Sequence, residues 1–88
     1  MAAELDVITK TYGLILWSIG HTAKFPRSHR FVLGERIERR LHDVLEYLIR
    51  AKYTHDKEPI LNDVNILLET LRFQFRLAKD LRVLNLRS

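Results

Sequence analysis

The chain of 88 residues contains no cysteine, two prolines and three glycines. Without cysteine it cannot form a disulfide scaffold, a thiol nucleophile or a cysteine-ligated zinc or iron–sulfur site. The scarcity of proline and glycine argues against a fold rich in strands and tight turns, which depend on these residues. No window approaches the ~18 consecutive apolar residues of a membrane span, and the N-terminus lacks the basic start of a signal peptide. We therefore expect a cytoplasmic protein with no membrane partner.

What the chain does contain is typical of one small folded domain. Hydrophobic residues make up 47% and charged residues 30% of the sequence, a balance that argues against an intrinsically disordered tail. We expect a single domain over residues 1–88, because the chain is too short for two. A chain this short and this apolar often completes its core by self-association, so an oligomer is expected.

Apolar residues recur at helical spacing in three segments, at about residues 4–23, 29–53 and 59–83. The dipeptide Phe25-Pro26 separates the first two segments, because proline removes a hydrogen-bond donor and disfavours helical geometry in the residue before it. Three helices joined by short connections predict an all-α fold, an antiparallel helical bundle.

Local signals refine the ends and the faces of these helices. Ser28 is predicted to cap the second helix, because its hydroxyl can accept from a free backbone N–H. Pro59 is predicted in the first turn of the third helix. In the first helix, one arc is predicted to form the amphipathic face; it comprises Leu5, Ile8, Tyr12, Ile15, Leu16 and Ile19.

The third helix carries two apolar stripes. The first stripe is the predicted core face and comprises Ile60, Val64, Leu67, Leu68, Leu71, Phe75 and Ala78. The second stripe lies roughly opposite part of the first and includes Ile66, Phe73, Leu77 and Leu81. A helix that is apolar on two sides must be covered on two sides. We therefore predict that the second stripe is an interface with another copy or with a partner.

The charge of +4 is unevenly distributed along the sequence. Residues 24–40 and residues 72–88 each sum to +4, whereas residues 1–23 sum to −1 and residues 41–71 sum to −3. The chain therefore has two basic segments, which permit a polyanionic partner.

Six cations in these segments are the candidate nucleic-acid-binding residues: Lys24, Arg27, Arg30, Arg72, Arg76 and Lys79. The first three surround the proline turn without acidic neighbours, and the last three share one helix face at spacings of four and three. Lysine and arginine neutralise phosphates without base-specific geometry. No helix-turn-helix, zinc finger or aromatic sheet motif is present, so we expect binding through backbone and shape.

A purely structural explanation of these charges stays open. Cations near the end of the third helix also complement its dipole. In the second helix, Glu35–Arg39, Arg39–Asp43 and Glu46–Arg50 are spaced for ion pairs of ~0.2–0.5 kcal/mol each. A structural oligomeric subunit, whose charge serves solubility, is therefore one alternative function.

Signals for catalysis are weak. The four histidines do not pair at helical spacing, so neither a metal site nor a cofactor is predicted. Arg36 precedes His42 by six residues and Arg50 precedes His55 by five, which resembles the motif of small helical HEPN-type ribonucleases. Spacings this loose arise easily by chance. We expect no enzymatic activity, with a ribonuclease acting through Arg50 and His55 as the other alternative.

One segment is distinctive, KFPRSHRFVLGERI at residues 24–37. It resembles the loop-and-helix signature of a four-helix-bundle family that includes the accessory variability determinant (Avd) of diversity-generating retroelements and proteins encoded by intervening sequences in 23S ribosomal RNA genes. Residues 10–17 resemble the first helix of that family, and residues 76–82 resemble the end of its third helix. The resemblance covers nearly the whole chain.

The resemblance implies a helical bundle that assembles as a homopentamer. It also implies a non-enzymatic accessory protein that binds a reverse transcriptase and RNA or DNA, and so supports mutagenic copying of a template RNA into cDNA (mutagenic retrohoming). The six candidate cations would then contribute to the basic binding surface. The family's fourth helix has no counterpart before Ser88, and the second stripe of the third helix is where such a helix, or another chain, would dock.

Overall fold

The chain folds into three long helices. The structure, a computed structural model, describes the backbone of residues 2–82 and the side chains of residues 6–82. No strand occurs in this part of the chain, which confirms the all-helical prediction. None of its helices is long and apolar enough to cross a bilayer. The elements are α1 (Ala2–Thr22), a short α2 (Arg27–His29), the π-helix η1 (Arg30–Gly34), α3 (Glu35–Tyr53) and α4 (Glu58–Asp80).

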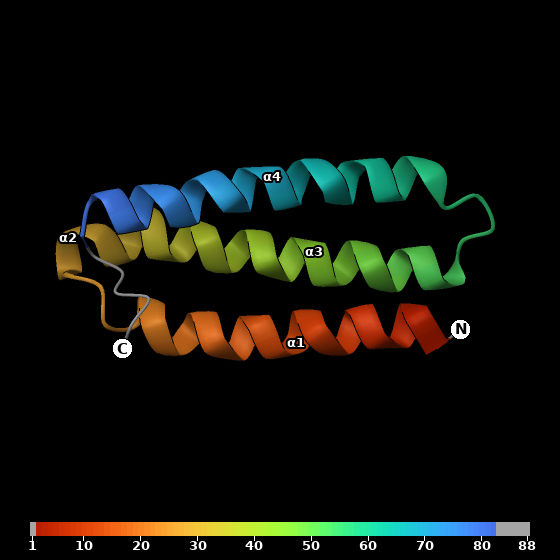
Figure 1. The fold of residues 1–88 in the computed structure, drawn as a ribbon, viewed down its shortest axis with the longest axis horizontal. Coiled ribbons are helices and arrows are strands. Elements are labelled where there is room, and N and C mark those ends of the chain that lie inside the picture. The colour runs from red at the N-terminus through yellow and green to blue at the C-terminus, as the bar shows by residue number, and fades with distance from the viewer. Residues whose placement is uncertain (1, 83–88) are drawn as a thin grey trace.

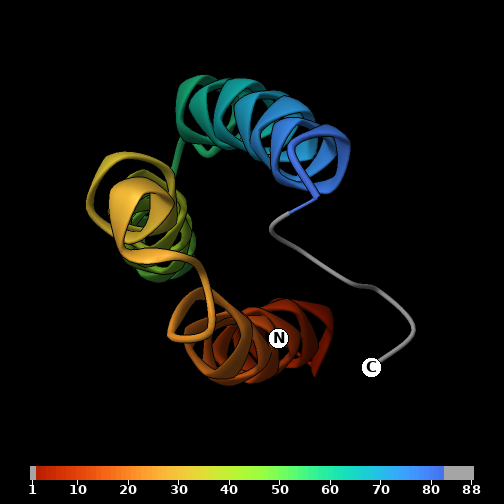
Figure 2. The ribbon, with the colours of Figure 1, turned by 90° about the vertical axis from the view of Figure 1, so that its left-hand side faces the viewer.

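The helices lie side by side and measure 43 × 20 × 19 Å together. The chain runs along α1, reverses through α2 and η1, returns along α3, and reverses again into α4 (Figure 1). Viewed end-on, α3 lies between the two outer helices, and α1, α3 and α4 form an open arc (Figure 2). The predicted end of the third helix at Val83 lies outside the described residues.

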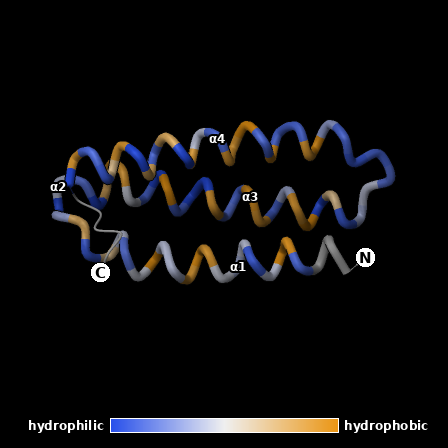
Figure 3. The backbone as a smooth tube through the Cα atoms, viewed as in Figure 1, coloured by the Kyte–Doolittle hydropathy of each residue, from blue (hydrophilic) through white to orange (hydrophobic). Residues whose placement is uncertain are grey.

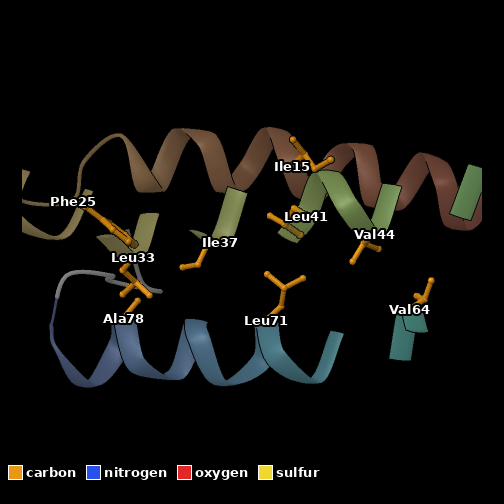
Figure 4. Packing of buried hydrophobic residues seen from close by; sticks show 9 residues of the cluster. All are labelled: Ile15, Phe25, Leu33, Ile37, Leu41, Val44, Val64, Leu71 and Ala78. Carbon is orange, nitrogen blue, oxygen red and sulfur yellow. The ribbon is translucent and has the colours of Figure 1, made fainter. Parts of the chain in front are cut away.

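The core is built on α3. Hydrophobic and hydrophilic residues alternate along α3 and α4 (Figure 3), so one side of each helix is apolar. From α3, Ile37 and Leu41 are completely buried. Side chains from every other long helix and from the first turn meet them (Figure 4). The cluster comprises Ile15, Phe25, Leu33, Ile37, Leu41, Val44, Val64, Leu71 and Ala78.

Helix α1 packs through a face different from the predicted one. The predicted arc is only partly correct, because Tyr12, Leu16 and Ile19 are exposed while Ile15 is buried. The buried face instead consists mainly of small hydroxyl residues at helical spacing. The hydroxyl residues are Thr11, Ser18 and Thr22, and Ile15 completes the buried face.

Two of these three hydroxyl side chains are buried with nearby groups accepting their hydrogen bonds. The Thr11 hydroxyl donates to the Val7 carbonyl oxygen at 2.9 Å, and the Thr22 hydroxyl donates to Glu38 Oε1 on α3 at 2.5 Å. A pattern of hydrophobicity alone does not reveal such a face. The apolar residues of α1 are consequently left on its flanks.

The first reversal of the chain depends on a buried phenylalanine. Phe25 is buried, and Pro26 occupies the N-cap position of α2 without a side-chain capping bond. The prediction that Ser28 caps the second helix is therefore wrong, because Ser28 lies inside α2. At Gly34, η1 packs against the side chains of Phe25 and Thr22, since a Cβ at this position would stand 3.4 Å from both. Pro59 lies in the first turn of α4, as predicted.

Candidate nucleic-acid interface

The two basic segments, which are far apart in the sequence, lie at the same end of the bundle. The two chain reversals place the end of α4 beside the start of α3 (Figure 1), and Phe25, Leu33 and Ala78 pack together there (Figure 4). We call residues 17–40 and 72–82 the basic end. It carries ten lysines and arginines against three carboxylates, a net charge of +7.

The opposite end has the reverse charge. Residues 2–16 and 41–71 carry four lysines and arginines against eight carboxylates, a net charge of −4. The bundle is therefore electrically polarised along its long axis, and its basic end is the surface that a polyanion would meet first.

All six predicted binding residues lie at the basic end with exposed side chains. Lys24 lies in the turn after α1, Arg27 in α2 and Arg30 at the start of η1. Arg72, Arg76 and Lys79 lie in the last third of α4. The fold thus brings the two predicted trios to one end of the molecule.

Two of the four cations at the acidic end have close carboxylate partners. Lys10 pairs with Asp6 at 3.1 Å, and Arg50 pairs with Glu46 at 3.2 Å. These spacings of four residues match ordinary surface ion pairs on helices.

At the basic end, close pairing is the exception. Arg39 pairs with Glu35 at 3.0 Å. Arg72 lies 4.0 Å from Glu69, and Arg76 lies 3.9 Å from Asp80. Both of these long pairs are well exposed, so each contributes at most ~1 kcal/mol and is easily exchanged for a phosphate.

Seven cations of the basic end have no carboxylate within 4 Å among residues 6–82. Within that range, these cations have no opposite charge close by. Cations that only stabilise the surface would instead be expected in ion pairs. The arrangement disfavours the alternative of a structural subunit with its charges in ion pairs. The seven are Lys24, Arg27, Arg30, Arg36, Arg40, Lys79 and Arg82.

Sequence reasoning missed three of these residues: Arg36 and Arg40 on α3, and Arg82 just after α4. Arg36 and Arg40 line a polar hollow of about 320 Å³ on α3 together with Arg39 and Asp43. The predicted Arg39–Asp43 ion pair is absent, because Arg39 is engaged by Glu35. A signal was present in the sequence, since Arg36 has no carboxylate three or four residues away on either side.

The four residues predicted as an interface are all exposed apolar side chains, three on α4 and the fourth, Leu81, directly after it. Ile66 and Phe73 are 65% and 56% exposed, and Leu77 and Leu81 are also exposed. Tyr12 and Leu16 on α1 add further exposed apolar surface. Exposed apolar side chains repeated along a helix are the kind of surface that marks an interaction site.

The two residues of the ribonuclease alternative, Arg50 and His55, lie near the end of α3 and in the connection that follows it. The Arg50 guanidinium pairs with Glu46 and lies 5.5 Å from the centre of the Tyr47 ring. His55 is exposed in the connection between α3 and α4. Within the described side chains, no three metal-ligating residues come close enough to hold an ion.

Comparison with known families identifies the family to which the chain belongs. A family model described as bAvd-like matches residues 7–88. The chain belongs to the bAvd-like family. No curated protein and no solved structure matches it. The residues that match the family model include the whole basic end of this bAvd-like chain. The match agrees with the resemblance seen in residues 24–37.

Proposed function

We propose that this bAvd-like protein is a non-enzymatic accessory of a retroelement reverse transcriptase. In this role it binds RNA or DNA and supports mutagenic copying of a template RNA into cDNA. Family membership supports the accessory role. The observation that carries the nucleic-acid role is the concentration of seven unpaired cations at one end of the bundle.

The proposed binding works through phosphates. Each lysine or arginine that meets a phosphate releases condensed counterions, and this release favours binding without reading the bases. Arginine adds paired hydrogen bonds to phosphate oxygens. The basic end offers both, whereas the acidic end repels the same backbone. The protein would therefore approach nucleic acid with its α2 end first.

Self-association belongs to the same proposal. The exposed stripe of Ile66, Phe73, Leu77 and Leu81 on α4 supports an interface between copies. Copies assembled side by side would combine their basic ends into one larger cationic surface, with the homopentamer implied by the resemblance as the proposed state. The reverse transcriptase would then bind the assembled particle together with the nucleic acid.

Charge reversal tests the nucleic-acid role. The triple variant Arg72→Glu, Arg76→Glu, Lys79→Glu removes exposed cations of the basic end. Its matched control, Lys10→Glu, Arg50→Glu, Lys52→Glu, makes the same change in charge outside that end. We expect the first variant to weaken RNA or DNA binding more than tenfold and the control to change it far less. Equal losses in the two variants would contradict a localised site.

Partner capture tests the accessory role separately. A tagged protein should retain a reverse transcriptase encoded next to it, and native mass measurement should give the subunit count of the particle. Clean protein should not cleave RNA, whereas cleavage abolished by His55→Ala would favour the ribonuclease. Failure to retain any neighbouring transcriptase would contradict the accessory role.

A further inference from the structure

A mainly apolar hollow lies at the basic end, between α1 and the π-helix. It measures about 360 Å³, and its lining includes Ile19 of α1, Arg30, Phe31 and Gly34 of η1, and Glu35 and Glu38 of α3. It is separate from the hollow formed by Arg36, Arg39 and Arg40. Its lining combines an aromatic residue, Phe31, with an arginine, Arg30.

Phe31 is unusually placed for a phenylalanine. It is 62% exposed, whereas Phe25, six residues earlier, is 1% exposed and anchors the core. The π-helix Arg30–Gly34 directs Leu33 and Gly34 inward and leaves Phe31 at the surface. Short π-helical segments are frequently found at functional sites. An exposed phenylalanine ring leaves apolar surface in contact with water and adds nothing to the packing of the core.

The charged groups around the hollow leave one cation uncommitted. The Arg30 guanidinium donates to the Phe25 carbonyl oxygen at 3.4 Å, and no carboxylate among the described residues pairs with it. Both carboxylates of the lining are engaged: Glu35 accepts from Arg39 at 3.0 Å, and Glu38 accepts from Thr22. The hollow thus presents a free aromatic face beside a free positive charge.

We propose that this hollow binds one unpaired nucleotide, with its base stacked on Phe31 and its phosphate held by Arg30. Aromatic stacking and cation–phosphate contact together are how proteins hold single strands, because every base has a π-face that a duplex hides. The protein therefore binds single-stranded nucleic acid more tightly than duplex. This inference rests on the proposed function, because it names the kind of nucleic acid at the basic end.

A second copy of the chain is the competing occupant of the hollow. The proposed contact between copies uses the exposed stripe, whose residues do not line the hollow, and a second basic end seated in the hollow would place like charge against Arg30. A nucleic-acid strand instead brings phosphates, whose negative charge can pair with Arg30 and with the unpaired cations near it.

The test is Phe31→Leu, which keeps apolar bulk and removes the ring. The probes are a fluorescent single-stranded 12-mer of DNA and a hairpin duplex with the same number of phosphates, compared by anisotropy at one salt concentration. We expect wild type to prefer the single strand, and Phe31→Leu to weaken that complex about tenfold with less than a twofold effect on the hairpin. Phe31→Tyr should restore single-strand binding. Tyr53→Leu, which removes an exposed ring at the end of α3, outside the hollow and the stripe, should leave both affinities within twofold.

Several results would overturn the inference. One is wild-type protein that binds hairpin and single strand equally well. Another is unchanged single-strand affinity in Phe31→Leu, which would leave the proposed function intact. A third is a smaller particle for Phe31→Leu with both affinities reduced alike, which would assign the hollow to a second copy. Wild-type protein that binds neither probe would overturn the proposed function as well.

Discussion

The indole of Trp17 on α1 meets the ring of Phe75 on α4 edge to face, with the ring centroids 6.0 Å apart and the planes inclined by 62°. His21, one turn further along α1, stacks on the same indole at 4.1 Å. Since α3 lies between the outer helices (Figure 2), this aromatic group joins the two sides of the arc directly.

Replacing Phe75 should loosen the connection between the outer helices. Phe75→Leu keeps an apolar side chain but loses the edge-to-face pair, so we expect the free energy of unfolding to fall by ~0.5–1.5 kcal/mol. Tyr53→Leu, which alters an exposed ring at the end of α3, should change it by less than ~0.5 kcal/mol. Urea unfolding followed by fluorescence of Trp17, the sole tryptophan, measures both. Equal effects would contradict the bridging role.

The buried hydroxyl of Ser18 predicts a stabilising substitution. Ser18 is completely buried, and its Oγ has no hydrogen-bond partner among the residues that the structure describes. Ser18→Ala removes an unsatisfied polar group, so we expect a gain of ~1 kcal/mol in the free energy of unfolding, which corresponds to a rise of ~4–8 °C in Tm for a domain of this size.

Thr22→Val is the matched comparison for Ser18→Ala. The Thr22 hydroxyl donates to Glu38 across the helix interface, so its loss should cost ~1–3 kcal/mol, because it leaves a carboxylate without its donor. Thermal unfolding of both variants at one protein concentration distinguishes the two buried hydroxyls. A destabilised Ser18→Ala would show that its Oγ is satisfied.

Apolar periodicity in the sequence predicted the helices, because the strong patterns of α3 and α4 coincide with their buried faces. The same periodicity predicted the second stripe of α4. It failed on α1, where the buried face carries Thr11, Ser18 and Thr22, small hydroxyl residues that apolar periodicity does not register. It also failed at Ser28, because the buried ring of Phe25 and the following Pro26 decide where α2 begins.

The candidate site was predictable only in parts. Each basic trio was visible in the sequence, but their meeting at one end depends on two chain reversals that bring Leu33 against Ala78. The hollow beside Phe31 could not be predicted, because the expected helix had no π-helical turn at Arg30–Gly34.

Self-association should depend on the exposed stripe of α4. We expect sedimentation of wild type to give a particle several times the 10.5 kDa chain mass, which becomes smaller on dilution. The double variant Phe73→Glu, Leu77→Glu places charge on two exposed stripe residues, so it should yield monomer while retaining its helical circular dichroism. A wild type that is monomeric at every concentration would contradict the assembly.

The salt dependence of nucleic-acid affinity tests the central claim most directly, namely that the fold gathers unpaired cations into a phosphate-binding end. The measurement is the affinity of wild-type protein for a single-stranded oligonucleotide across a range of salt concentrations. With at least four of the seven unpaired cations on phosphates, the logarithm of the affinity should fall linearly with the logarithm of salt, with a slope of about −3 or steeper. An affinity that does not change with salt would contradict the account.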